Sequence, residues 1–98
     1  MRYRFKKKKL EDIFTTEKGA HKYPAEVIEA FFEAMAVIAA AHDERDLYAL
    51  KGFHFEKLSG DRKGEHSLRL NKQYRLIVAF EKDADGKFVL VIDIEDYH

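Results

Sequence analysis

The spacing of hydrophobic positions changes partway along this chain. From Leu10 to about His42, apolar residues recur at three- and four-residue steps, which is the period of an amphipathic helix. From Leu47 onward, short β-branched and aromatic runs alternate with turns, a pattern typical of strands. The sequence therefore predicts helices in the first half and a sheet in the second.

Two helices are predicted in the first half, after a short strand at Tyr3–Phe5. Leu10, Ile13 and Phe14 have the spacing of a short amphipathic helix that ends near Gly19. Pro24 suits the first residue of a second helix, which reaches about His42. Its apolar stripe is expected to be core rather than a ligand groove. The residues of this stripe are Val27, Ile28, Phe31, Phe32, Met35, Ile38 and Ala39.

An antiparallel meander is predicted in the second half. Gly60–Gly64 is a glycine-rich charged turn, Asn71–Gln73 is a tight connection, and Asp85-Gly86 favours a hairpin. The extended segments between these turns are Phe53–Leu58, His66–Leu70, Tyr74–Glu81 and Phe88–Ile94.

The two-residue period of a strand assigns side chains to faces of this sheet. If the helices cover the face that carries Leu68, Leu70, Leu76, Val78 and Phe80, then Arg69 and Arg75 share the opposite face. On the last strand, Phe88, Leu90, Ile92 and Ile94 are expected to alternate with Val89, Val91 and Asp93, before the chain ends beside the sheet at Asp96-Tyr97-His98.

The length and composition suit a single domain over residues 1–98, with 46% apolar and 37% charged residues. There is no cysteine, which excludes disulfides and thiolate zinc sites and favours a cytoplasmic location. The basic N-terminus is followed by Glu11 and Asp12 instead of an apolar stretch, so we do not expect a signal peptide. No apolar run is long enough to span a bilayer.

The net charge is zero, but the charges are segregated. Residues 1–10 carry six basic and no acidic side chains, and residues 51–75 carry seven basic and three acidic ones. These two segments can form one positive face that attracts a polyanion. An equal alternative is that the lysine run Lys6–Lys9 is only a solvated surface.

The residue types near the C-terminus resemble those of a nuclease surface and suit metal-independent cleavage of RNA. This reaction activates a 2′-hydroxyl, stabilises charge at phosphorus and protonates the leaving 5′-oxygen. Arg69 and Arg75 suit the phosphate, because guanidinium donates paired hydrogen bonds and keeps its charge. His98 suits the proton transfer, and Tyr97 can stack on a base. No cofactor is required.

Each of these residues also has a structural interpretation. Either arginine can be a surface ion-pair partner of Asp93 or Glu95, Tyr97 can cap the core, and a terminal histidine is usually frayed. The five histidines lack the spacing of a zinc site, so no metal is predicted.

Three segments resemble those of HigB toxins, a branch of the RelE-type bacterial toxins. They are Gly60-Asp-Arg-Lys-Gly64, Ser67-Leu-Arg-Leu-Asn-Lys-Gln-Tyr-Arg-Leu76 and Glu95-Asp-Tyr-His98, and the opening Phe5–Phe14 is also similar. The resemblance implies an α+β RelE-like fold, with an N-terminal strand and two helices packed on a twisted antiparallel sheet. It implies a ribosome-dependent endoribonuclease that cuts mRNA in the decoding site, with rRNA contacts. It also implies a cognate antitoxin with a helix-turn-helix domain.

The active-site set that the resemblance implies is Arg75, Tyr97 and His98, supported by Asp96, with Arg69 and Arg62 as phosphate contacts; Lys63 is a further candidate for RNA binding. Family members often have a lysine immediately before the glycine of the turn, where this chain has Ser59. Some have a histidine a little upstream, where this chain has Glu56. Lys57 and His54 lie two residues earlier, and Lys57 can substitute if its segment is extended.

Two other functions remain open at this point. One is a non-catalytic RelE/ParE-like toxin that inhibits a protein such as DNA gyrase, and the other is an inactive relic that only binds its antitoxin.

Overall fold

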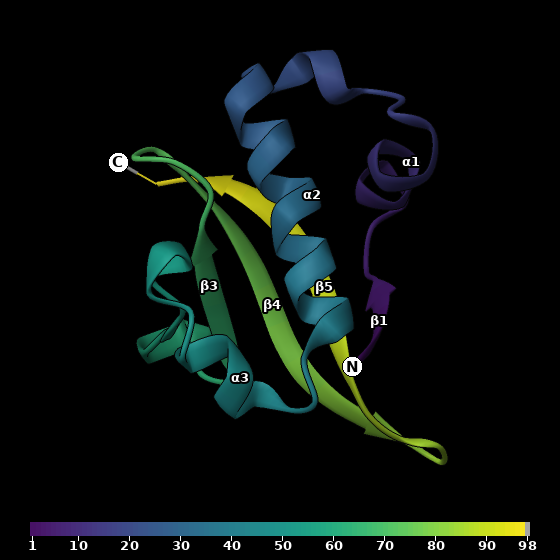
Figure 1. Ribbon diagram of the computed structural model, residues 1–98, viewed down its shortest axis with the longest axis vertical. Coiled ribbons are helices and arrows are strands. Elements are labelled where there is room, and N and C mark those ends of the chain that lie inside the picture. The colour runs from purple at the N-terminus through teal and green to yellow at the C-terminus, as the bar shows by residue number, and fades with distance from the viewer. Residues whose placement is uncertain (98) are drawn as a thin grey trace.

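The computed structural model describes residues 1–97 and contains a five-stranded sheet with helices packed on it (Figure 1). The strand order is β1-β5-β4-β3-β2. β1 runs parallel to β5, and every other neighbouring pair is antiparallel. The predicted α+β class is confirmed, with a parallel edge strand added to the antiparallel meander. The strands are β1 (Arg2–Phe5), β2 (Glu56–Lys57), β3 (Glu65–Arg69), β4 (Tyr74–Asp83) and β5 (Gly86–Asp96).

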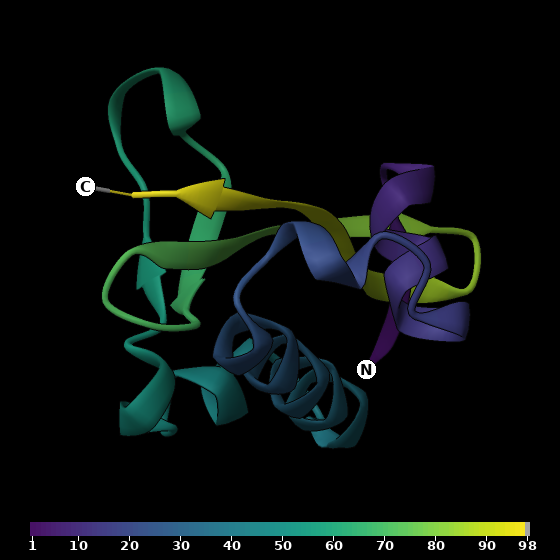
Figure 2. The same cartoon turned by 90° about the horizontal axis from the view of Figure 1, so that it is seen from above.

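The helices lie mainly on one side of this sheet. Figure 2 shows α2 on one side of β4 and β5, and the loop between β2 and β3 rising on the other. None of the helices within residues 1–97 is long and apolar enough to cross a membrane. The α-helices are α1 (Lys8–Thr16), α2 (Ala25–Ala40) and α3 (Glu44–Tyr48), and the 3-10 turns are η1 (Ala20–Lys22), η2 (Lys51–Phe53) and η3 (Gly60–Arg62).

Both predicted helices are confirmed, with small differences at their ends. α1 stops at Thr16 because Glu17 adopts a left-handed conformation, with φ of 61°. α2 begins one residue after Pro24 and stops at Ala40, since Ala41 turns to an extended conformation. The predicted stripe of α2 is buried except for Ala39, which is exposed, and the partly buried Phe32. Ala39 lies one position off the row of buried residues that ends at Ile38, so it faces solvent.

A third helix, α3, was not predicted. The Asp43 carboxylate caps it by accepting a hydrogen bond from the Arg45 N–H at 2.9 Å, and Leu47 is buried beneath it. The turn η2 follows, so the predicted extended segment Phe53–Leu58 was too long: only Glu56–Lys57 is strand. The Asp at position 43 was a capping signal that the hydrophobic pattern did not reveal.

The register of β3 and β4 places side chains on faces as predicted. Leu68 pairs with Leu76, and Arg69 pairs with Arg75. All five predicted inward residues belong to, or pack against, the core cluster beneath α1 and α2. The core therefore fixes which face the arginines occupy.

A β-bulge in β5 interrupts the predicted alternation of that strand. Ile77 pairs with Asp93 but Val78 pairs with Val91, so Ile92 is an extra residue. Ile94 therefore packs in the same core as Val91, while Ile92 clusters with Ile77 on the opposite face. The expectation that Ile92 and Ile94 share a face was wrong for this reason.

The basic N-terminal segment is largely neutralised within the chain. Arg2 and Arg4 both pair with Asp83, and this contact, led by the hydrogen bond from Arg2, lowers the Asp83 pKa to about 2. Lys7 and Lys9 pair with Asp93 at 2.7 and 3.1 Å. Burial acts to raise the Asp93 pKa, but these lysines outweigh it and the pKa is lowered. Most of this segment is thus occupied in ion pairs and does not form a free positive face.

His66 on β3 is buried in an aromatic cluster. Its ring stacks on Phe55, with centroids 5.1 Å apart, and contacts Phe80 and Tyr48 edge-on. Neither ring nitrogen has a hydrogen-bond partner among residues 1–97. Burial lowers the pKa of His66, against the opposing charge of Glu44. The imidazole is therefore held in its neutral form.

Acidification should destabilise the protein through His66. Because its pKa is lowered in the folded state, the unfolded chain binds the proton more readily. Above the pKa of about 6.5 that His66 has in the unfolded chain, proton uptake at the imidazole does not lower the unfolding free energy. As pH falls below that value, the unfolded chain takes up a proton and the unfolding free energy decreases. The urea midpoint of the wild type should fall between about pH 7.5 and about pH 5, and His66→Phe should show a smaller fall. Parallel curves for the two proteins would contradict this.

Truncation of the fully buried Phe31 should test the packing of α2 on the sheet. Phe31→Ala should lower the unfolding free energy by about 3 to 5 kcal/mol, because it removes a large buried side chain and leaves a cavity that the neighbouring residues cannot fill. Glu33→Ala, an exposed position on the same helix, serves as the control and should change stability by less than about 0.5 kcal/mol. Urea titration measures both, and equal effects would show that Phe31 is not packed as described.

Candidate functional site

Two arginines face each other on the side of the sheet opposite α2. Arg69 near the end of β3 is the direct cross-strand partner of Arg75 at the start of β4. Like charges placed directly opposite each other destabilise a sheet. The sheet keeps two positive charges side by side although their repulsion lowers its stability, so the pair is a candidate anion-binding site.

Arg75 is held tightly by its neighbours. Its side chain is only 14% exposed, and one guanidinium nitrogen lies 3.3 Å from Glu56 Oε1. The same nitrogen donates to the Ser67 hydroxyl at 3.4 Å, and the guanidinium lies 5.0 Å from the centre of the Tyr97 ring. Its ion-pair partner is thus Glu56, and neither Asp93 nor Glu95 fills that role. These contacts fix the guanidinium at a defined place on the open face.

Arg69 differs from Arg75 in having no such partner. It is partly exposed, and its guanidinium makes no hydrogen bond or ion pair with another residue in the range 1–97. It borders an open hollow formed by the β3–β4 turn and the start of α2. Its charge is therefore available to a ligand. The other residues around this hollow are Glu26, Gly52, Leu70, Asn71, Lys72 and Gln73.

The C-terminal segment is fastened to the β3–β4 turn. The Tyr97 N–H donates to the Gln73 carbonyl, and the Gln73 side chain donates to Asp96 Oδ2 at 3.1 Å. Tyr97 is 37% exposed and contacts the Arg75 guanidinium, so it does not cap the core. Arg75 and Tyr97 are therefore brought together, and Asp96 lies beside Gln73 as the cross-strand partner of Tyr74, whereas His98 lies outside the described residues.

Arg62 lies on the same face but is occupied by carboxylates. It bonds to Glu65 at 2.8 Å and makes a paired contact with Glu95 at 2.8 Å. These bonds, with Glu95 first, raise the pKa of Arg62. The contacts tie η3 to β3 and β5, so a phosphate would compete with two carboxylates for this guanidinium. Lys63 follows η3 and is exposed.

The structure does not bring Lys57 and His54 to the arginines. Lys57 is extended, but it pairs with His66, whose ring lies on the helix-covered side. His54 is in a turn with φ of 45°, outside the strands. Glu56 is the residue of this segment that reaches Arg75. Sequence analysis missed it because its face depends on the register of a two-residue strand.

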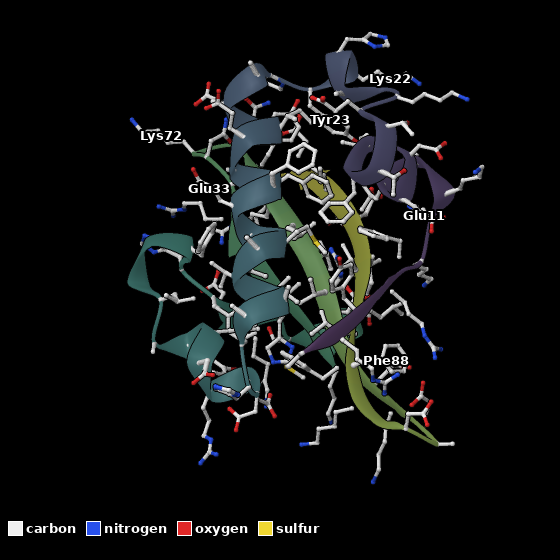
Figure 3. All side chains as sticks on the ribbon, turned by 45° about the vertical axis from the view of Figure 1, so that its right-hand side comes forward. Glu11, Lys22, Tyr23, Glu33, Lys72 and Phe88 are labelled. Atoms are coloured by element: carbon white, nitrogen blue, oxygen red, sulfur yellow. The ribbon has the colours of Figure 1, made fainter. Side chains whose placement is uncertain are left out.

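The candidate site lies far from the paired N-terminal arginines. Figure 3 shows Lys72, on the β3–β4 turn, and Phe88, which the Arg4 guanidinium covers at 4.4 Å, at opposite ends of the sheet. Within the described residues, no group of three histidine, aspartate or glutamate side chains is placed to hold a metal ion. The side chains that meet here can bind a phosphate and stack on a planar ring.

Comparisons with known proteins agree with this architecture. The chain is similar to the YoeB/ParE toxin from Agrobacterium tumefaciens, with a TM-score of 0.63 and 15% identity over the whole of both chains. It is also similar to a chain of the YoeB–YefM complex from Staphylococcus aureus, with a TM-score of 0.60 and 21% identity over all of this chain and 97% of that one. These likenesses concern the fold.

Sequence comparison identifies the family more closely. The chain is 40% identical to Toxin HigB-1 of Vibrio cholerae serotype O1 over 77 residues, which cover 79% of this chain and 81% of that protein. Residues 3–98 match the family described as the RelE-like toxin of type II toxin-antitoxin system HigB. This match spans the sheet, both long helices and the arginine pair, so the chain belongs to the HigB family of RelE-like toxins of type II toxin–antitoxin systems.

Proposed function

We propose that this toxin is a ribosome-dependent mRNA endonuclease that cleaves without a metal ion. The observation that carries the proposal is the pairing of Arg69 with Arg75, whose guanidinium lies against the exposed Tyr97 ring. The two guanidinium groups would bind the scissile phosphate and stabilise the charge that builds on it. Tyr97 would hold a neighbouring base by stacking.

Proton transfer to the leaving 5′-oxygen is assigned to His98 in this proposal. Imidazole releases a proton readily near neutral pH, and His98 directly follows Tyr97 in the chain. Asp96 would support the terminal segment through its bond to Gln73. Arg62 would act chiefly by positioning Glu95 and the η3 turn, while Lys63 would contact RNA outside the cleaved bond.

The distribution of charge supports dependence on the ribosome. The chain has no net charge, and five of the six basic residues in its first ten pair with internal carboxylates. Tight binding to free RNA normally requires several unpaired basic groups. The ribosome would therefore supply the mRNA in an extended form, together with rRNA contacts, in the cytoplasm.

A cognate antitoxin is the partner that type II membership implies. We propose that this antitoxin carries a helix-turn-helix domain, as the resemblance to HigB toxins indicated. A protein target such as DNA gyrase and an inactive relic are the alternatives that the following experiment separates from cleavage.

Cleavage of mRNA on programmed ribosomes tests the proposal. Wild-type protein should produce cuts that free mRNA does not show, and Arg75→Ala should lower the rate by about 100-fold or more, because a charge-stabilising group is lost. His98→Ala should lower it by a similar or greater factor. Arg45→Ala, which removes an exposed arginine of α3 distant in the fold, is the matched control and should cleave normally.

Circular dichroism should show that every variant remains folded. An absence of cleavage by the wild type would contradict the proposal. Inhibition of gyrase supercoiling by wild type and His98→Ala alike would then favour the protein-targeting alternative, and inactivity in both assays would favour the relic.

A further inference from the structure

His66 is a buried ionisable side chain that the proposed function does not use. It is 5% exposed, and both ring nitrogens lack a hydrogen-bond partner among the residues that the structure describes. A buried polar group without a partner lowers stability. A phenylalanine could make similar ring contacts without this cost, so the imidazole at this place indicates a role for its ionisation.

The ring of His66 connects one stretch of the chain to the sheet. Phe55, which directly precedes β2, stacks on it with an angle of 7° between the ring planes, and Tyr48 of α3 lies steeply inclined to both rings. Within the described part of the chain, the backbone hydrogen bonds of residues 43–53 join neighbours in that stretch and do not reach the sheet. Side-chain packing and the two-residue strand β2 therefore hold this stretch in place.

Protonation of His66 would act against this packing in two ways. Burial, the largest cause, lowers its pKa, and the charge of Lys57 acts in the same direction, while Glu44 of α3 opposes them. Lys57 of β2 is also the cross-strand partner of His66, and like charges directly opposite each other destabilise a pair of strands. The neighbouring rings carry no charge near neutral pH, and β4 contributes the apolar Phe80. Both the core and β2 therefore disfavour a proton on His66.

We propose that His66 is a pH-sensitive switch: the neutral ring holds residues 44–57 on the sheet, and protonation releases them. These residues comprise α3, η2 and β2. Release exposes the charged ring to water, which removes the cost of burying it. It also relieves the left-handed backbone of His54, with φ of 45°, between η2 and β2. A short segment of this kind opens at a lower free energy than the whole sheet.

The switch would act on the arginine face through β2. Glu56 in this strand lies 3.3 Å from the Arg75 guanidinium, and the hydroxyl of Ser67, which follows His66, accepts a hydrogen bond from the same group. Release of β2 removes the ion-pair partner of Arg75 but leaves β3 paired with β4. The position of the phosphate-binding guanidinium would then depend on pH, and this consequence rests on the proposed function.

Hydrogen exchange of backbone amides in the wild-type toxin, followed residue by residue by NMR from about pH 7.5 to about pH 5.5, tests the switch. The Leu58 N–H, which donates to the Glu65 carbonyl at 2.9 Å next to β2, reports on the segment. Because opening takes up one proton, its opening constant should rise about 5-fold or more as pH falls across this range. It should remain at least about 100-fold above that of Phe31 in the core helix α2.

His66→Phe keeps a ring in the cluster but cannot take up the proton, so its Leu58 opening constant should stay level across this range. His42→Phe, which replaces an exposed histidine just before α3, is the matched control and should show the wild-type rise. The dependence on pH decides the outcome, so a His66→Phe variant that is looser at every pH remains informative.

No rise in the wild type, or an equal rise in His66→Phe, would overturn the proposal. Equal opening constants for Leu58 and Phe31 would also overturn it, because they indicate unfolding of the whole domain. The measurement uses no RNA, so failure of the switch leaves the proposed function standing, and failure of cleavage on ribosomes leaves the switch standing.

Discussion

The cross-strand pairing of Arg69 with Arg75 is the constraint on which the rest of the site depends. Burial of Leu68 and Leu76 on the other face fixes this register, because a slip by one residue would exchange the two faces. The turn between the strands reinforces it, since the Asn71 side chain accepts hydrogen bonds from two successive N–H groups, those of Gln73 and Tyr74. The core thus maintains two like charges side by side.

The bulge in β5 supplies the opposite charges that this face requires. With one extra residue inserted at Ile92, the strand keeps Ile94 in the core and presents Glu95 opposite Arg75. Glu95 then binds Arg62 across the face, and the strand continues to Tyr97 beside the Arg75 guanidinium. A strand without the bulge could not keep both Val91 and Ile94 in the core.

Much of the fold and part of the site could be predicted from the sequence. Periodicity identified both long helices and placed Arg69 and Arg75 on the open face, since a half-buried strand alternates strictly. It could not reveal the bulge, because Ile92 and Ile94 are equally apolar and only pairing with β4 distinguishes them. The helix α3 was missed because its single turn depends on capping by Asp43 and Asp46 more than on an apolar stripe. Glu56 was missed because its position depends on long-range pairing with Ser67.

If the arginine pair lowers the stability of the sheet in order to bind phosphate, the substitution Arg69→Thr should separate the two effects. Threonine favours strands and removes the like-charge contact, so the unfolding free energy should stay the same or rise by up to about 1 kcal/mol. Cleavage of ribosome-bound mRNA by the same variant should fall about 10-fold or more. A variant that loses stability while cleaving normally would show that Arg69 serves the fold and does not bind the phosphate.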